Sequence, residues 1–182
     1  MIYTLSCCLN RNRYIMYVSY GSTTENRDMD GAADGWRWAV GLFAVAAVWA
    51  GLLLGVSFLA TPAKFLAPSL SMSVALDVGR HTFAVFNKLE WLLAATVLLM
   101  AFGARARLSA MMVIALCLVV AVETFWLLPL LDQRVGLIIL GQQPPASNRH
   151  SLYILLELAK LAALIVVSID MTRRFQRPLN PL

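Results

Sequence analysis

Charged residues are scarce in this chain, and cysteine is nearly absent. Only 14% of the 182 residues are charged, 60% are hydrophobic, and the mean hydropathy is +0.72. Soluble domains carry about a quarter charged residues, so this composition excludes a soluble globular protein and indicates an integral membrane protein. The three cysteines, Cys7, Cys8 and Cys117, form neither a C-x-x-C motif nor a paired set. They give no support to a metal cluster or a disulfide framework.

Enzyme and nucleic-acid signatures are also missing. The chain has no nucleophile-elbow motif, no phosphate-binding loop and no zinc-binding H-E-x-x-H, so covalent catalysis has no candidate residue and a non-enzymatic role is favoured. The formal charge is +5, but the basic residues flank apolar runs instead of forming a stripe with aromatics. They therefore predict membrane topology and no nucleic-acid partner.

Four apolar runs are long enough to cross about 30 Å of hydrocarbon as helices. None alternates as a barrel strand would, and an unpaired strand would leave its amides unsatisfied in lipid. The predicted fold class is all-α, a polytopic four-transmembrane-helix bundle occupying residues 36–170. The runs are Trp38 to Ala60, Thr82 to Phe102, Leu108 to Leu128, and Leu152 to Ile169.

The two ends of the chain differ from this apolar domain. Residues 1–35 are expected to form a cytoplasmic tail, and residues 171–182 a basic cytoplasmic tail. The segment from Met1 to Arg27 is rich in Ser, Thr, Asn, Tyr and Cys and lacks a signal-peptide pattern. Either it is a disordered tail, or Met29 is the true start.

Basic residues set the expected orientation. Seven arginines flank the first span, the second connection and the last span, and four basic residues occupy the other two connections. The positive-inside rule then predicts cytoplasmic N- and C-termini in an inner (plasma) membrane. The first group is Arg27, Arg37, Arg105, Arg107, Arg173, Arg174 and Arg177. The second group is Lys64, Arg80, Arg134 and Arg149.

The outer connections and the first span carry further local signals. Leu70 to Val78 and Val135 to Leu140 are partly apolar, so they either lie along the interface or extend the neighbouring helices. Gly141 to Asn148, with two prolines, is expected to break the chain before the last helix. Gly51 and Gly55 form G-x-x-x-G, which predicts close packing by a neighbouring helix.

The two halves of the chain share a pattern. F-x-x-x-P ends the first span at Pro62 and the third at Pro129, and an Arg-His pair opens the second span at His81 and the fourth at His150. We interpret this pattern as two helical hairpins in parallel orientation, as in transporters with repeated halves. The alternative is that Pro and Arg-His merely mark helix ends at one interface.

Ionisable residues lie within the predicted spans, where an unpaired charge is costly. His81 and Lys88 are seven residues apart, as are His150 and Glu157, which predicts that Lys88 and Glu157 are partners. Glu90 faces roughly away from His81. We predict one buried charge layer near the outer face, which comprises Lys88, Glu90, Glu123, Glu157 and Lys160.

The two histidines are candidate ligands above this layer. Neutral imidazole binds heme iron and copper, so His81 and His150 are the predicted cofactor-binding residues, and a proton relay or a small polar ligand is an alternative. Histidines at helix starts also serve as interfacial anchors, and buried ion pairs also serve only to select the helix register. Met100, Met111 and Met112 are not arranged as a copper-ligand cluster.

From about Trp38 to Ile169 the chain resembles uncharacterised four-helix membrane proteins of the copper-resistance-D-like superfamily, especially the transmembrane protein 205-like branch. The resemblance implies a four-helix membrane fold, and its relatives are associated with copper uptake or heme-linked oxidation. Those relatives place histidines within their membrane helices, whereas His81 and His150 lie near helix ends. The resemblance rests on the following residues: Phe58, Pro62, Phe65, His81, Thr82, Phe83, Trp126, Pro129, Asp132, Arg134, His150, Tyr153, Glu157 and Lys160.

Two functions follow from these expectations. The first is binding of a cofactor, a metal ion or a small polar ligand in the charged layer. The second is a non-enzymatic scaffold or accessory subunit whose charges only specify assembly, with a second copy or another membrane protein as the partner. In both cases the lipid bilayer surrounds the bundle.

Overall fold

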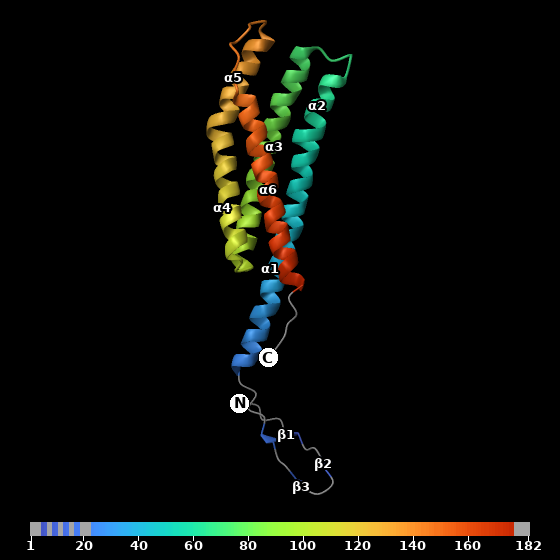
Figure 1. Ribbon diagram of the computed structural model, residues 1–182, viewed down its shortest axis with the longest axis vertical. Helices are drawn as coiled ribbons and strands as arrows, with labels where there is room; N and C mark the ends of the chain where they lie inside the picture. Colours follow the sequence, from blue (N-terminus) through green and yellow to red (C-terminus); the bar gives the residue numbers. More distant parts are fainter. Residues whose placement is uncertain (1–4, 7–8, 11–12, 15–16, 19–22, 177–182) are drawn as a thin grey trace.

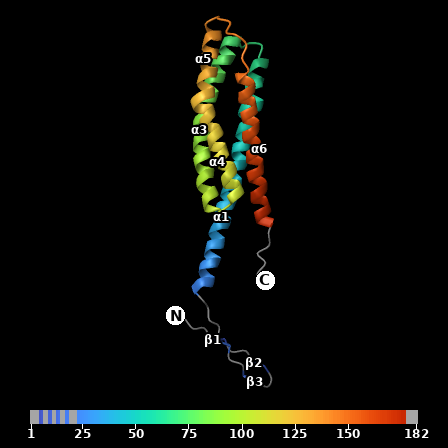
Figure 2. The ribbon, with the colours of Figure 1, turned by 60° about the vertical axis from the view of Figure 1, so that its left-hand side comes forward.

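The computed structural model describes residues 5–6, 9–10, 13–14, 17–18 and 23–176. Four helices in this part of the chain are long and apolar enough to cross a membrane, and they lie together in one bundle (Figures 1 and 2). This arrangement confirms the predicted all-α four-helix bundle. The candidate spans are Gly35–Leu66, Met72–Gly103, Arg107–Ile139 and Arg149–Gln176.

The first and third spans are each built from several helical segments, whereas the second and fourth are continuous. The first comprises α1 (Thr23–Leu53), η1 (Leu54–Ala60), α2 (Thr61–Ala63) and η2 (Lys64–Leu66). The second is α3 (Met72–Gly103). The third comprises α4 (Arg107–Val122), η3 (Glu123–Leu127) and α5 (Leu128–Ile139), and the fourth is α6 (Arg149–Gln176).

The described residues of the N-terminal segment form four two-residue strands. β1 (Leu5–Ser6) pairs with β4 (Tyr17–Val18), and β2 (Leu9–Asn10) pairs with β3 (Arg13–Tyr14), both antiparallel. Met29 lies within α1, and its assignment as the true start stays a prediction.

The helices extend beyond the apolar runs. α3 begins at Met72, where the Ser71 side chain accepts a hydrogen bond from the Val74 amide, so the predicted segment Leu70 to Val78 extends the helix. α5 ends in a Schellman motif with Gly141 at φ +78°, and the Gln142 amide donates to the Leu137 carbonyl. The predicted break from Gly141 is therefore confirmed.

Two π-helical segments, η1 and η3, precede the two prolines of the repeated motif. A proline lacks the amide that an α-helix needs, so nearby carbonyls must find other donors. The Thr61 amide and hydroxyl both donate to the Val56 carbonyl, and the Leu128 amide donates to the Glu123 carbonyl five residues earlier. The two F-x-x-x-P segments thus share a local conformation, in support of the predicted repeat.

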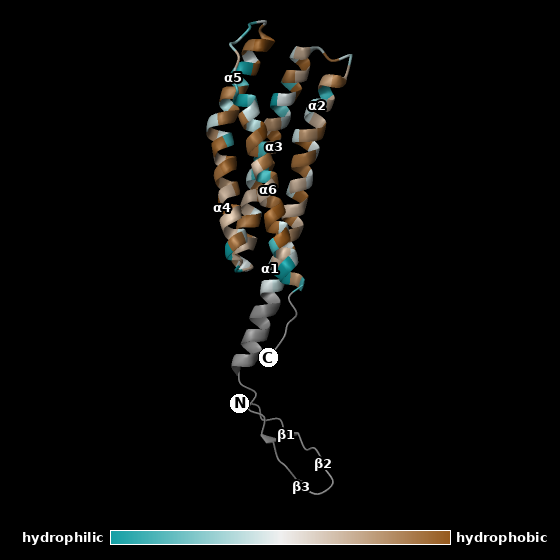
Figure 3. Cartoon of the chain, in the orientation of Figure 1, coloured by the Kyte–Doolittle hydropathy of each residue, from teal (hydrophilic) through white to brown (hydrophobic). Residues whose placement is uncertain are grey.

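The core is a set of side chains spaced alternately three and four residues apart on every helix. This spacing is typical of left-handed four-helix bundles. In α1, Leu42, Ala46, Trp49 and Leu53 are buried, and the other helices continue the pattern. Outward-facing positions carry large apolar side chains such as Leu92 and Leu118, each 64% exposed. Figure 3 shows apolar residues along all four helices, as expected for contact with lipid.

We call the end with the α2–α3 and α5–α6 connections the distal end, and the end with the short α3–α4 connection the proximal end. α1 packs against α3 and α6, and α4 packs against the same two helices. Toward the distal end α5 contacts α6 only sparsely, so the bundle opens there. The predicted packing role of Gly51 and Gly55 is wrong within this chain, since an added Cβ at either residue meets no atom within 4 Å.

Candidate functional site

A buried ionic cluster connects three spans. The Lys160 Nζ of α6 donates to Glu90 Oε1 of α3 at 2.7 Å, to Glu123 Oε2 of η3 at 2.6 Å, and to Glu157 Oε1 of α6 at 2.9 Å. All four side chains are at most 2% exposed. An ammonium group has three N–H donors, so Lys160 uses every one.

The core periodicity explains why these residues meet. In α6 the buried positions are Tyr153, Glu157, Lys160, Leu164, Val167 and Met171, and in the third span Glu123 follows Val113, Leu116 and Val120 at the same spacing. Glu90 likewise continues the buried stripe of α3 toward Ala94 and Val97. The charged residues therefore occupy ordinary core positions, where helix packing brings them together.

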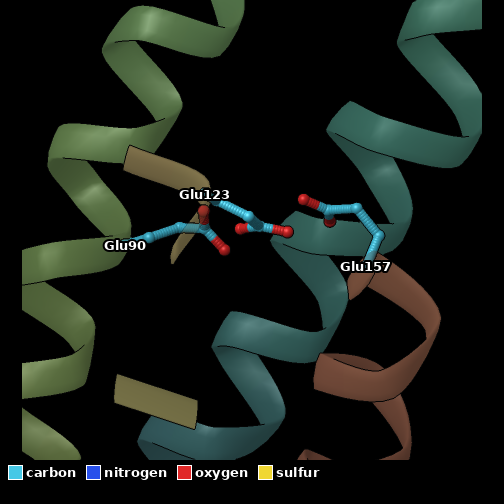
Figure 4. Close-up of side chains that lie close together, drawn as sticks. All are labelled: Glu90, Glu123 and Glu157. Carbon is cyan, nitrogen blue, oxygen red and sulfur yellow. The ribbon is translucent and has the colours of Figure 1, made fainter. Parts of the chain in front are cut away.

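Two neutral donors support the carboxylates. The Trp49 indole donates to Glu90 Oε1 at 3.2 Å, and the Ser57 hydroxyl donates to Glu157 Oε2 at 3.1 Å. Glu123 Oε1 is buried and has no hydrogen-bond partner among the described residues. Figure 4 shows the three carboxylates pointing toward one another, and one oxygen from each lies within 4.8 Å of the others.

The predicted Lys88–Glu157 pair is wrong. Lys88 is exposed, whereas Glu157 pairs with Lys160 one turn away on its own helix. Lys88 and His81 do share a face of α3, but that face points out of the bundle, and Glu90 on the other side points inward. Of the predicted charge layer, Glu90, Glu123, Glu157 and Lys160 are buried and Lys88 is not.

The histidines have different surroundings. Because α3 begins at Met72, His81 lies in the third turn of its helix, where its side chain is 70% exposed and its Nδ1 is 2.9 Å from the Asp77 carbonyl oxygen. His150 is the second residue of α6 and lines the distal cavities described next, whereas His81 does not line them. Cofactor binding by either histidine stays a prediction.

Two adjoining cavities of about 520 and 480 Å³ lie between the spans at the distal half. They share apolar walls that include Phe65, Phe83 and Val135, and both contact His150 and Tyr153. These volumes fall within the range of small-molecule sites. We call the two together the distal cavity.

The distal cavity reaches the ionic cluster through Glu157, which lines its second part together with Ser57. The first part descends to Asn87 and Thr124. The Asn87 amide and the Trp91 indole each donate to the Thr124 hydroxyl oxygen at 3.0 Å. The floor of the cavity is thus polar, whereas most of its walls are apolar.

Basic groups outnumber acidic ones in the first part of the distal cavity. Lys64, Arg80 and Lys88 line it with a single carboxylate, Asp132, which lies 3.3 Å from Arg80 Nε. Lys64 Nζ lies 5.7 Å from the centroid of the Phe83 ring. Neither Lys64 nor Lys88 has a carboxylate within 4.0 Å among the described residues, so two cationic groups of the cavity have no ionic partner there.

Gly79 allows Lys64 to take this position. A Cβ on Gly79 would collide with the Lys64 ammonium, so the side chain of Lys64 crosses α3 where that helix has no side chain of its own. Sequence reasoning missed this contact, and it also missed the donors Trp49 and Ser57. The three- and four-residue spacing of the α1 core would have placed Trp49 inside the bundle.

No protein-family model, no curated protein and no solved structure matches this chain. The resemblance to the copper-resistance-D-like superfamily therefore stays a prediction.

Proposed function

We propose that this protein binds a small anionic ligand with an apolar portion in the distal cavity, above the ionic cluster. The proposal rests mainly on one observation, the two cavity lysines, Lys64 and Lys88, that have no carboxylate partner in the described part of the chain. Ionisable groups inside membrane proteins usually face a cavity and mark a binding site. A carboxylate or phosphate group supplies the charge-assisted hydrogen bonds that these ammonium groups lack.

The walls of the distal cavity indicate the chemistry of the rest of the ligand. Phe65, Leu76, Phe83 and Leu131 favour an apolar portion, whereas an inorganic ion would leave most of this surface without a partner. Lys88, Trp91 and Phe65 are exposed on the outer surface of the bundle while lining the cavity. The ligand is therefore proposed to enter sideways from the bilayer. An α3 side chain leans toward the distal end, so Lys88 extends toward the membrane surface.

Native mass spectrometry of the protein in mild detergent tests this proposal with three probes: decanoate, decylamine and inorganic phosphate. Decanoate should bind as a single adduct, and decylamine, with the same chain and the opposite charge, should not. Lys64→Gln and Lys88→Gln should each weaken decanoate binding about tenfold, equivalent to about 1.4 kcal/mol. Arg149→Gln is the matched control, since Arg149 is exposed and lies outside the lining of the cavity. Equal binding of decanoate and decylamine would refute the proposal.

Heme or copper binding by His81 and His150 is tested on the same preparation. An absorption spectrum and elemental analysis of the wild type, His81→Ala and His150→Ala proteins suffice. A Soret band or bound copper that either substitution removes would establish the cofactor. A colourless, metal-free protein would leave the anionic ligand as the proposed occupant.

The scaffold function is favoured by a separate observation. Lys160 joins α3, η3 and α6 through three ionic contacts, which fixes the relative register of those helices. A protein that only assembles in this way should bind none of the three probes. We also propose an inner (plasma) membrane with both termini cytoplasmic, a topology that reporter fusions after Gln176 and within the α5–α6 connection test.

A further inference from the structure

The ionic cluster carries more negative than positive groups. Glu90, Glu123 and Glu157 surround a single ammonium group, Lys160, so the fully ionised cluster has a net charge of −2. Trp49 and Ser57, the groups that α1 and η1 contribute, are uncharged donors, and the other titratable group that faces the carboxylates is the buried Tyr153 phenol of α6. A buried site inside a bilayer strongly disfavours such an excess. Because Lys160 is the one basic group that contacts these carboxylates in the described part of the chain, charge balance favours uptake of a further positive charge at the cluster.

The position of Lys160 decides which cation fits. Three carboxylate oxygens within 4.8 Å of one another are suitable metal ligands. However, the Lys160 ammonium already contacts all three carboxylates at 2.6 to 2.9 Å, in the place that a metal ion would need. A proton needs no such space, because it binds one carboxylate oxygen and cancels one charge.

The three carboxylates differ in how many hydrogen bonds they accept. Glu90 Oε1 accepts from Trp49 and Lys160, and Glu157 receives donors on both oxygens, from Lys160 and Ser57. Glu123 accepts only from Lys160, and its Oε1 is buried without a partner in the described part of the chain. Protonation of that oxygen removes the charge that the surroundings stabilise least.

We propose that the cluster is a proton-binding site in which Glu123 carries the proton. The proton adds to Glu123 Oε1 and leaves as the cluster ionises, with no other bond made or broken. Because Glu157 belongs both to the cluster and to the lining of the distal cavity, its carboxylate provides the contact through which protons reach the site. This proposal does not depend on the ligand proposed for the cavity.

Infrared spectroscopy of the purified protein tests this assignment, since a protonated carboxyl group has a C=O band that a carboxylate lacks. The wild type should show this band near neutral pH, and the band should weaken as the pH is raised. Glu123→Gln should remove it, whereas Glu90→Gln should keep it. The change from Glu to Gln preserves side-chain volume, and gel filtration verifies folding of each variant.

Three results would overturn the proposal. The first is a wild type with no protonated-carboxyl band, which needs no variant to interpret. The second is a band that survives Glu123→Gln and disappears in Glu90→Gln. The third is saturable binding of Mn²⁺ or Zn²⁺ in calorimetry that Glu123→Gln abolishes, because the site would then be a metal site. The protonated-carboxyl band, together with the absence of such metal binding, supports proton binding at Glu123.

Discussion

Replacing Lys160 with methionine removes the only ammonium group of the ionic cluster and keeps most of the side-chain volume. Breaking a buried ion pair from one side costs about 3–5 kcal/mol. Here three carboxylates lose their common partner, and protonation of some of them offsets part of the loss. We therefore expect Lys160→Met to lower the free energy of unfolding by about 3–5 kcal/mol. At about 2–4 °C per kcal/mol, Tm falls by about 6–20 °C.

Thermal unfolding in mild detergent, followed by circular dichroism, measures this change. Lys88→Met is the matched control, because Lys88 is exposed and has no carboxylate partner among the described residues. It should alter stability by about 0.5 kcal/mol or less. A fourfold variant that also converts Glu90, Glu123 and Glu157 to Gln should recover most of the loss, since it leaves no unpaired charge. Equal Tm values for Lys160→Met and Lys88→Met would refute the reasoning.

Two further predictions concern packing toward the proximal end. Ser109→Ala should cost about 1.5–3 kcal/mol in unfolding experiments, because the buried Ser109 hydroxyl donates to a carboxylate of α6 at 2.7 Å. Ser168→Ala, which removes a bond only to its own helix, should cost less, and the reverse order would contradict the account. Gly103→Ala should lower Tm, because its Cβ would lie 2.5 Å from the Trp38 ring. Gly51→Ala, with open space around it, should leave Tm unchanged or raise it.

Hydropathy was sufficient to predict the four spans, because lipid requires long apolar helices whatever the details of packing. Hydropathy predicted the ends of the helices less accurately. The apolar run of the second span starts at Thr82, whereas Ser71 caps a helix that extends ten residues further toward the distal end. Capping depends on a few local hydrogen bonds, to which an average over a window of residues is insensitive.

The angular position of charges was harder to predict. The relative directions of His81, Lys88 and Glu90 around α3 follow from helical geometry and were predicted correctly. The direction that faces the bundle was predicted wrongly, because His81 was taken as the reference for the inner face and its side chain points outward. The alternation of three and four residues through Glu90, Ala94 and Val97 identifies the inner face, because the buried residues of α3 recur at that spacing.

The distal cavity was beyond sequence reasoning for a different reason. It depends on how far α5 and α6 diverge, which is a property of several helices at once. The Lys64 position also requires Gly79, a residue that is 15 positions away along the chain and lies on the next span. No local pattern connects such residues, so only the three-dimensional arrangement identifies them.

The π-helical segment η3 determines which side of α5 borders the distal cavity. It holds one residue more than the same length of α-helix, and each residue turns a helix by about 100°. Deleting one exposed residue there, such as Phe125, would let the segment return to a regular α-helix without turning α5, so Asp132 should keep its contact with Arg80. α4 would also keep its orientation, because its own buried residues pack against the bundle. The extra residue in η3 therefore lets α4 and α5, two parts of one span, turn different faces toward the helices around them.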